Sequence, residues 1–162
     1  MSASSVSAVR RAYACLAAQT PLLTDCGRLC GGACCKGDEQ TGMLLFPGEE
    51  TLLASCSFGR VIPAHFELAG RSVQLFICDG TCARESRPLA CRLFPLFLHF
   101  RQDGTPRVKL DSRARAVCPL CRYGLVGLSE DFVAAAKDAY AALLADDDCA
   151  AFLRALDEAF RL

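Results

Sequence analysis

The sequence has little histidine, no excess of either charge and no long apolar run. Its 162 residues include only two histidines, and 18 basic residues balance 18 acidic ones. Because the net charge is zero, no overall field attracts phosphate backbones or an anionic membrane surface, and we expect no nucleic-acid partner. The longest apolar runs, such as Leu93 to Leu98, stop far too early to cross a bilayer, so no membrane partner is expected. A protein partner remains open.

The length and composition indicate one globular domain over residues 1–162. Just over half of the residues are apolar while 22% are charged, a balance typical of globular rather than disordered or membrane-spanning chains. A domain of this size buries roughly two-thirds of its unfolded surface. The chain therefore does not need a metal merely to form a core.

Twelve cysteines are far more than ordinary proteins carry, and their meaning depends on the compartment. Arg10 and Arg11 precede a stretch, 12–18, that is short and only mildly apolar for a signal peptide. Apolar residues at three- and four-residue steps predict an amphipathic helix there instead, at Val6, Val9, Tyr13 and Leu16. We therefore expect a cytoplasmic protein.

In a reducing cytosol disulfides do not persist, so a cysteine-rich chain is better explained by metal binding or catalysis. A secreted disulfide scaffold is the alternative. It fits the even cysteine count, but the apolar content indicates a chain that needs no such cross-links.

The pattern along the chain predicts an α+β fold. Terminal helices would surround small β-hairpins and a loop-rich, cysteine-lined metal centre. We expect a short helix over 47–55, hairpins over 60–77 and 96–110, and two helices over 129–161, with Ser129 and the acids 146–148 at their starts.

Three cysteine blocks carry the candidate chemistry, because metal knuckles combine closely spaced cysteines with glycine or proline. A zinc site or an iron-sulfur cluster needs four ligands, so nine candidates imply two centres, or one centre with accessory thiols. The candidates are Cys26, Cys30, Cys34, Cys35, Cys78, Cys82, Cys91, Cys118 and Cys121.

The spacing within the blocks predicts their local structure. Cys26 and Cys30 would share one face of a helical turn that Gly31 and Gly32 end, leaving the Cys34–Cys35 pair on a loop. Prolines should keep the segment 87–95 away from regular helix. For Cys118 and Cys121 a metal ligand pair, a redox pair and structural thiols all remain open.

The remaining cysteines and histidines are given structural interpretations. Cys15, Cys56 and Cys149 stand alone in helical contexts, where cysteine usually acts as a small hydrophobe. His65 and His99 are interpreted as surface or hydrogen-bonded residues. We therefore expect a sulfur-rich site. Arg87 and Arg92 could donate hydrogen bonds to its sulfurs or pair with the acids around them.

The cysteine pattern resembles that of the YkgJ-type cysteine-cluster family, described as zinc- or iron-chelating with a CxxCxxCC signature. The resemblance covers about residues 26–97 and is most specific in its second half. It rests on Gly31-Gly32-Ala33-Cys34-Cys35, on Cys78 and Cys82, and on Arg87-Pro88-Leu89-Ala90-Cys91-Arg92-Leu93-Phe94-Pro95. The first block departs from the signature, with three residues between its cysteines instead of two.

These observations favour a metal-binding protein that holds a zinc ion or an iron-sulfur cluster. The alternative is a cluster-dependent enzyme or redox protein. Some members of the family are similar to flagellin lysine N-methylases, which implies a relation to protein lysine N-methylation. The sequence has no Gly-x-Gly-x-x-Gly phosphate loop, and whether the protein is an enzyme stays open.

Overall fold

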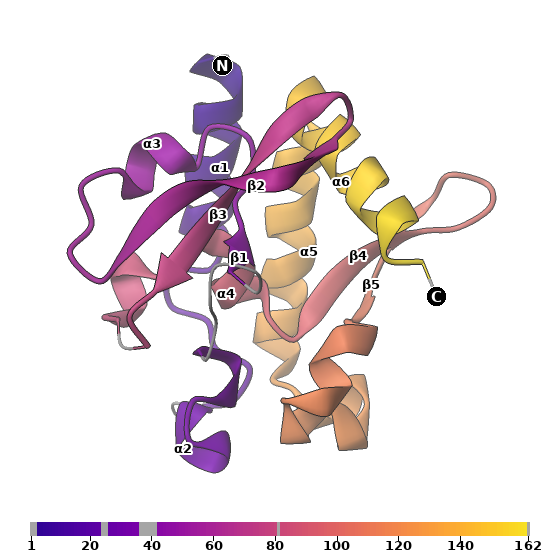
Figure 1. The fold of residues 1–162 in the computed structure, drawn as a ribbon. Coiled ribbons are helices and arrows are strands. Elements are labelled where there is room, and N and C mark those ends of the chain that lie inside the picture. Colours follow the sequence, from indigo (N-terminus) through magenta and orange to yellow (C-terminus); the bar gives the residue numbers. More distant parts are fainter. Residues whose placement is uncertain (1–2, 24–25, 36–41, 81, 162) are drawn as a thin grey trace.

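The chain adopts an α+β fold in which helices pack beside two small antiparallel sheets (Figure 1). The computed structural model describes residues 3–23, 26–35, 42–80 and 82–161. The α+β class predicted from the sequence is confirmed. Within these ranges, none of the helices combines the length and the apolar character that crossing a membrane requires.

Three longer helices, one N-terminal and two C-terminal, form the helical part of the core. Helix α1 (Ala3–Cys15) packs against α5 (Glu130–Leu144), which also contacts α6 (Asp147–Ala159). Of the apolar stripe predicted for the first helix, Val9 in α1 and Leu16 directly after it are buried, while Val6 and Tyr13 are partly buried. Ser129 stands at the N-cap of α5 without a side-chain cap hydrogen bond.

The first sheet has the strand order β1-β3-β2 and is antiparallel throughout. Strands β2 (Gly59–Leu68) and β3 (Arg71–Cys78) form the first predicted hairpin, which turns at Ala69 and Gly70 with positive φ angles. The two-residue strand β1 (Met43–Leu44) was not predicted, because two residues are too few to show an alternating pattern.

The second sheet is the other predicted hairpin, formed by β4 (Leu96–Phe100) and β5 (Pro106–Leu110). Alternate residues of β4 are buried, as period-two side-chain directions require. Helix α6 contacts β4, and the Asp157 carboxylate accepts the Phe100 amide at 3.1 Å.

Short helical turns occupy most of the remaining chain. The α-helical turns are α2 (Gly27–Cys30), α3 (Glu50–Leu53) and α4 (Leu89–Leu93). The 3₁₀ turns are η1 (Ala33–Cys35), η2 (Arg84–Ser86), η3 (Ser112–Ala116), η4 (Pro119–Tyr123) and η5 (Leu125–Gly127). Figure 1 places α2 and the segment 112–127 at the same end of the molecule.

Three local predictions need correction. Helix α3 is shorter than the expected 47–55, because residues 47–49 form a turn in which Gly48 has a φ of 87°. The segment 87–95 does contain a helix, α4, since Pro88 precedes its first turn and Pro95 follows its end, where neither interrupts it. Cys34 and Cys35 lie in the turn η1 rather than on an irregular loop.

Glu49 joins three parts of this fold through one fully buried carboxylate. Its Oε1 atom accepts the Tyr13 hydroxyl of α1 at 2.5 Å and the Leu89 amide of α4 at 2.6 Å, and its Oε2 atom accepts the Phe46 amide at 3.0 Å. Burial raises the pKa of Glu49, whereas these three donors act in the opposite direction. The start of α4 is thereby tied to α1 and to the segment before α3.

Replacing Glu49 with Ala should strongly destabilise the protein, because it leaves the buried Phe46 and Leu89 amides without their acceptor. At about 1–3 kcal/mol for each unsatisfied group, we expect the free energy of unfolding to fall by about 2–6 kcal/mol. Urea denaturation measures the free energy of unfolding. The control Glu158→Ala, an exposed position on α6, should change it by less than about 0.5 kcal/mol. Equal effects of the two substitutions would contradict the assigned role.

The same carboxyl group should also make stability depend on pH. Because its pKa is raised above the ordinary 4.5, the folded state binds this proton more tightly than the unfolded state. The stabilisation of the folded state that comes from protonated Glu49 is complete below pH 4.5, and it is lost as the pH rises through the raised pKa. Glu49→Gln, which keeps a carbonyl acceptor but does not titrate, should remove this part of the pH dependence in denaturation curves.

Candidate metal centre

Five of the nine candidate cysteines line a single cavity of about 70 Å³. They come from three separate parts of the chain: the turn η1, the end of β3 with the residues that follow, and helix α4. The five are Cys34, Cys35, Cys78, Cys82 and Cys91. Met43, Phe76 and Phe94 supply apolar walls.

Regular structure positions the second block. Strand β3 ends at Cys78, whose Sγ atom accepts the Gly80 amide at 3.4 Å. Gly80 has a φ of 89°, a conformation that favours glycine, and the chain turns here towards Cys82. Helix α4 carries Cys91 two residues after Leu89, whose amide is bound by Glu49.

The first block reaches the cavity through a tight turn. Helix α2 ends at Cys30, and Gly31 and Gly32 follow with φ angles of 59° and 69°, as their glycine content predicted. The Cys35 amide then donates to the Gly32 carbonyl at 2.8 Å. This turn brings Cys34 and Cys35 to the same cavity as Cys91.

The thiols that line the cavity influence one another. Burial raises the pKa of Cys91 well above its ordinary value, and the nearby Glu49, Cys35, Cys82 and Cys34 raise it further. Burial by the surrounding protein, followed by the neighbouring Cys35 thiol, raises the pKa of Cys34 to about 12. Several sulfurs are therefore close enough that negative charge on one opposes negative charge on the next.

Four of the nine predicted ligands lie outside the cavity. Cys26 and Cys30 do not line it, although both lie near enough to Cys34 to raise its pKa. Cys118 and Cys121 also lie outside it, in and beside the turn η4. Across the described ranges, no three histidine, cysteine, aspartate or glutamate side chains are arranged as ligands of a metal ion. The five thiols thus share a cavity without meeting at one point.

A larger and mainly apolar cavity of about 650 Å³ adjoins the first one. The two share the residues Cys34, Gly42, Met43 and Phe94 as parts of their walls. The rest of the larger cavity is lined mostly by aromatic and aliphatic side chains. Its only charged lining residues among those described are Asp111 and Arg113, which form a 2.6 Å ion pair.

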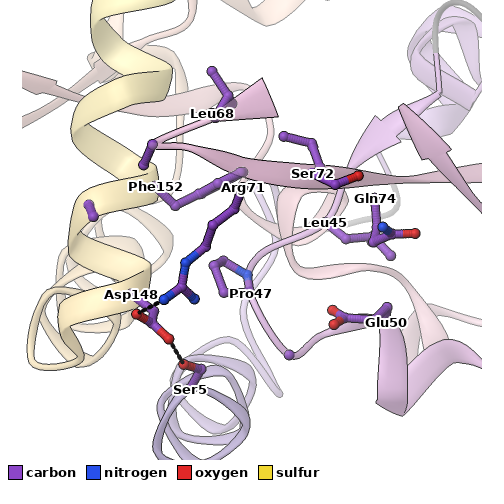
Figure 2. A pocket seen from close by; sticks show the side chains of 14 residues that line it. Ser5, Leu45, Pro47, Glu50, Leu68, Arg71, Ser72, Gln74, Asp148 and Phe152 are labelled. Carbon is purple, nitrogen blue, oxygen red and sulfur yellow. Dashed lines mark hydrogen bonds and ion pairs between the residues drawn. The ribbon is translucent and has the colours of Figure 1, made fainter. Parts of the chain in front are cut away.

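A third pocket, of about 100 Å³, contains none of the cysteines (Figure 2). Arg71 at the start of β3 pairs with Asp148 at 2.7 Å, and the Ser5 hydroxyl points to the same carboxylate. Ser5 also donates to Asp146 at 2.9 Å. These contacts connect the first hairpin and α1 to the start of α6, so we assign them a structural role.

Cys118 and Cys121 form a separate pair. The Cys121 amide donates to the Cys118 carbonyl at 3.2 Å. Partial burial and then the Cys118 thiol raise the pKa of Cys121 to about 11, while Arg115 lowers it. The pair shares no lining with the five-cysteine cavity.

The other cysteines and the histidines agree with their structural interpretations. Cys149 is fully buried, and Cys15 and Cys56 are half-buried against apolar clusters. His65 is exposed, and the Nδ1 atom of His99 lies 2.8 Å from the Asp157 carboxylate.

The arginines of the second block differ in their contacts. Arg92 donates to the carbonyls of Glu85 and Arg87 and lies 4.5 Å above the Tyr13 ring, whereas Arg87 lines the five-cysteine cavity. The sequence did not reveal the role of Glu49 at this site. Its position after Pro47 and Gly48 predicted a helix start, and no local pattern marks a carboxylate that binds an amide of residue 89.

Comparison of the chain with models of protein families, with curated proteins and with solved structures gave no match.

Proposed function

We propose that the five-cysteine cavity binds a thiophilic metal, either a zinc ion or an iron-sulfur cluster, and that this is the function of the protein. The observation that carries the proposal is the gathering of Cys34, Cys35, Cys78, Cys82 and Cys91 around one cavity from three separate segments. A core of this size needs no such arrangement for its own stability, and isolated structural cysteines need not gather.

The donor set fits the proposed group in its chemistry. Thiolate sulfur is a preferred ligand of zinc and of iron-sulfur clusters, and either needs four ligands from the five thiols available. Met43, Phe76 and Phe94 would keep water away from the bound group. Cys26 and Cys30, close to Cys34, are the candidates for accessory thiols.

The cysteine pattern supports membership of the YkgJ-type family as part of this proposal. Cys34, Cys35, Cys78, Cys82 and Cys91 are the cysteines on which that resemblance rests, and they are also the ones that line the cavity. The family's zinc- or iron-chelating description agrees with the proposed function.

A second candidate function is a cluster-dependent enzyme or redox protein. The observation that favours it is the 650 Å³ apolar cavity, which shares Cys34 and Phe94 with the proposed metal site and is of the size that small-molecule sites have. A molecule in that cavity would lie beside a metal-bound sulfur. A relation to lysine N-methylation rests on the family resemblance alone.

Replacing Cys91 or Cys34 with Ser should lower the metal content of the purified protein, because each substitution removes a thiolate from the cavity. Anaerobic purification, elemental analysis and an ultraviolet-visible spectrum of the same sample measure this. Iron with matching sulfide would identify a cluster, whereas a colourless protein with zinc would identify a zinc site.

Cys56→Ser is the matched control, since Cys56 is half-buried but lies outside the cavity. It should leave the metal content unchanged. Unaltered metal stoichiometry in both the Cys91 and the Cys34 variants would remove the proposed site.

Zinc binding to the metal-free protein should release protons, because raised pKa values keep Cys34 and Cys91 protonated near neutral pH. We expect about four protons per zinc ion if four thiols bind, and a binding constant that increases with pH. Titration in weak buffer with a pH indicator measures the release. Cys91→Ser should weaken zinc binding, because it removes one of the five thiols, and zinc binding without proton release would contradict thiolate ligation.

A further inference from the structure

The pair formed by Cys118 and Cys121 has a geometry that the proposed metal site does not use. The hydrogen bond from the Cys121 amide to the Cys118 carbonyl closes a turn of four residues. Such turns bring their end Cα atoms within about 7 Å, and a disulfide spans Cα separations of about 4.4–6.8 Å. The two thiols also lie close enough together for the Cys118 thiol to raise the pKa of Cys121.

The turn is held in place by its surroundings. The Cys118 amide donates to the Ala114 carbonyl at 2.7 Å, and the side chains of Ala114 and Leu120 are buried. Pro119 fixes the φ angle between the two cysteines. A bond between the sulfurs would therefore require little movement of the rest of the protein.

The pair is also reachable from solvent and lies in a basic environment. Both cysteines are only partly buried, and the nearby Tyr123 and Val126 are 67% and 94% exposed. Arg115 and Arg122 are exposed on either side of the pair, and Arg115 is close enough to act on the Cys121 thiol. These cations favour a reaction partner that carries negative charge.

We propose that Cys118 and Cys121 form a reversible dithiol–disulfide site that reacts with small anionic disulfides, of which oxidised glutathione is the representative. This site is separate from the five-cysteine cavity, and the proposal does not depend on metal binding there.

The reaction balances without any further reagent. The thiolate of one cysteine attacks a sulfur of the small disulfide, forming a mixed disulfide and releasing one small thiolate, which takes up a proton. The second cysteine loses its proton to solvent and attacks the protein sulfur of the mixed disulfide. This attack releases the second small thiolate, which takes up a proton to become the second small thiol. Two protein thiols are oxidised to one disulfide, and the small disulfide is reduced by two electrons to two thiols.

The oxidation state of this pair can be measured separately from that of the other cysteines. Trypsin cleaves after Arg115 and Arg122, and the peptide 116–122 contains both cysteines and no others. After incubation with reduced and oxidised glutathione, acid quenching and alkylation, mass spectrometry distinguishes two alkylated thiols from an internal disulfide. The disulfide form carries no alkyl group and is two hydrogen masses lighter than the unalkylated dithiol peptide. The incubation is carried out on the metal-free and on the zinc-loaded protein.

We expect peptide 116–122 to carry the internal disulfide at glutathione ratios that leave Cys149 reduced, in both forms of the protein. Cys118→Ser and Cys121→Ser should each leave a mixed disulfide with glutathione on the remaining cysteine, while Cys56→Ser should react as the unaltered protein does. Two alkylated thiols at every ratio, or two glutathione adducts without an internal disulfide, would overturn the proposal. Loss of metal binding in the cavity variants would not change this result.

The preference for an anionic partner has its own test. Arg115→Gln should slow the reaction with oxidised glutathione by about 2- to 5-fold, the size expected of an exposed ion pair. It should leave the rate with uncharged hydroxyethyl disulfide unchanged, and added salt should reduce the difference. Equal slowing with both disulfides would refute the charge-based preference, and circular dichroism checks that each variant is folded.

Discussion

The buried carboxylate of Glu49 is the contact on which the arrangement of the cysteine region depends. It accepts the Tyr13 hydroxyl from α1, the Phe46 amide before α3 and the Leu89 amide at the start of α4. Helix α4 is too short to be stable alone, since isolated helices need about 12–15 residues. Glu49 therefore fixes a one-turn helix against the core, and with it the position of Cys91 at the cavity.

The five-cysteine cavity is built at the junction of the helical core and the first sheet. Strand β3 delivers Cys78, α4 delivers Cys91, and the turn η1 brings Cys34 and Cys35 to the same place. Burial and mutual proximity raise the pKa of Cys34 and Cys91, so their negative charge is unfavourable until a cation offsets it. That cation can be a proton or, in the proposed function, a metal ion, and the two compete for the same sulfurs.

Two properties distinguish Cys118 and Cys121 from that group. They lie in a turn that is local in sequence, so their proximity does not depend on long-range packing. They are also flanked by the exposed Arg115 and Arg122, whereas Met43, Phe76 and Phe94 contribute apolar walls to the cavity. The same residue type is thus placed in two environments: a cavity that five thiols share, and a local turn with an arginine on each side.

The sequence by itself determined the α+β class, both hairpins, the terminal helices and the end of α2 at Gly31, because these depend on local periodicity and on glycine conformation. It also identified the cysteines that line the cavity, but as part of a set of nine. Only the tertiary structure decided which five of them share a cavity and that Glu49 positions α4. The Glu49–Leu89 contact joins residues 40 positions apart, and the cavity joins Cys34 and Cys35 to cysteines more than 40 positions later, separations that no local pattern encodes.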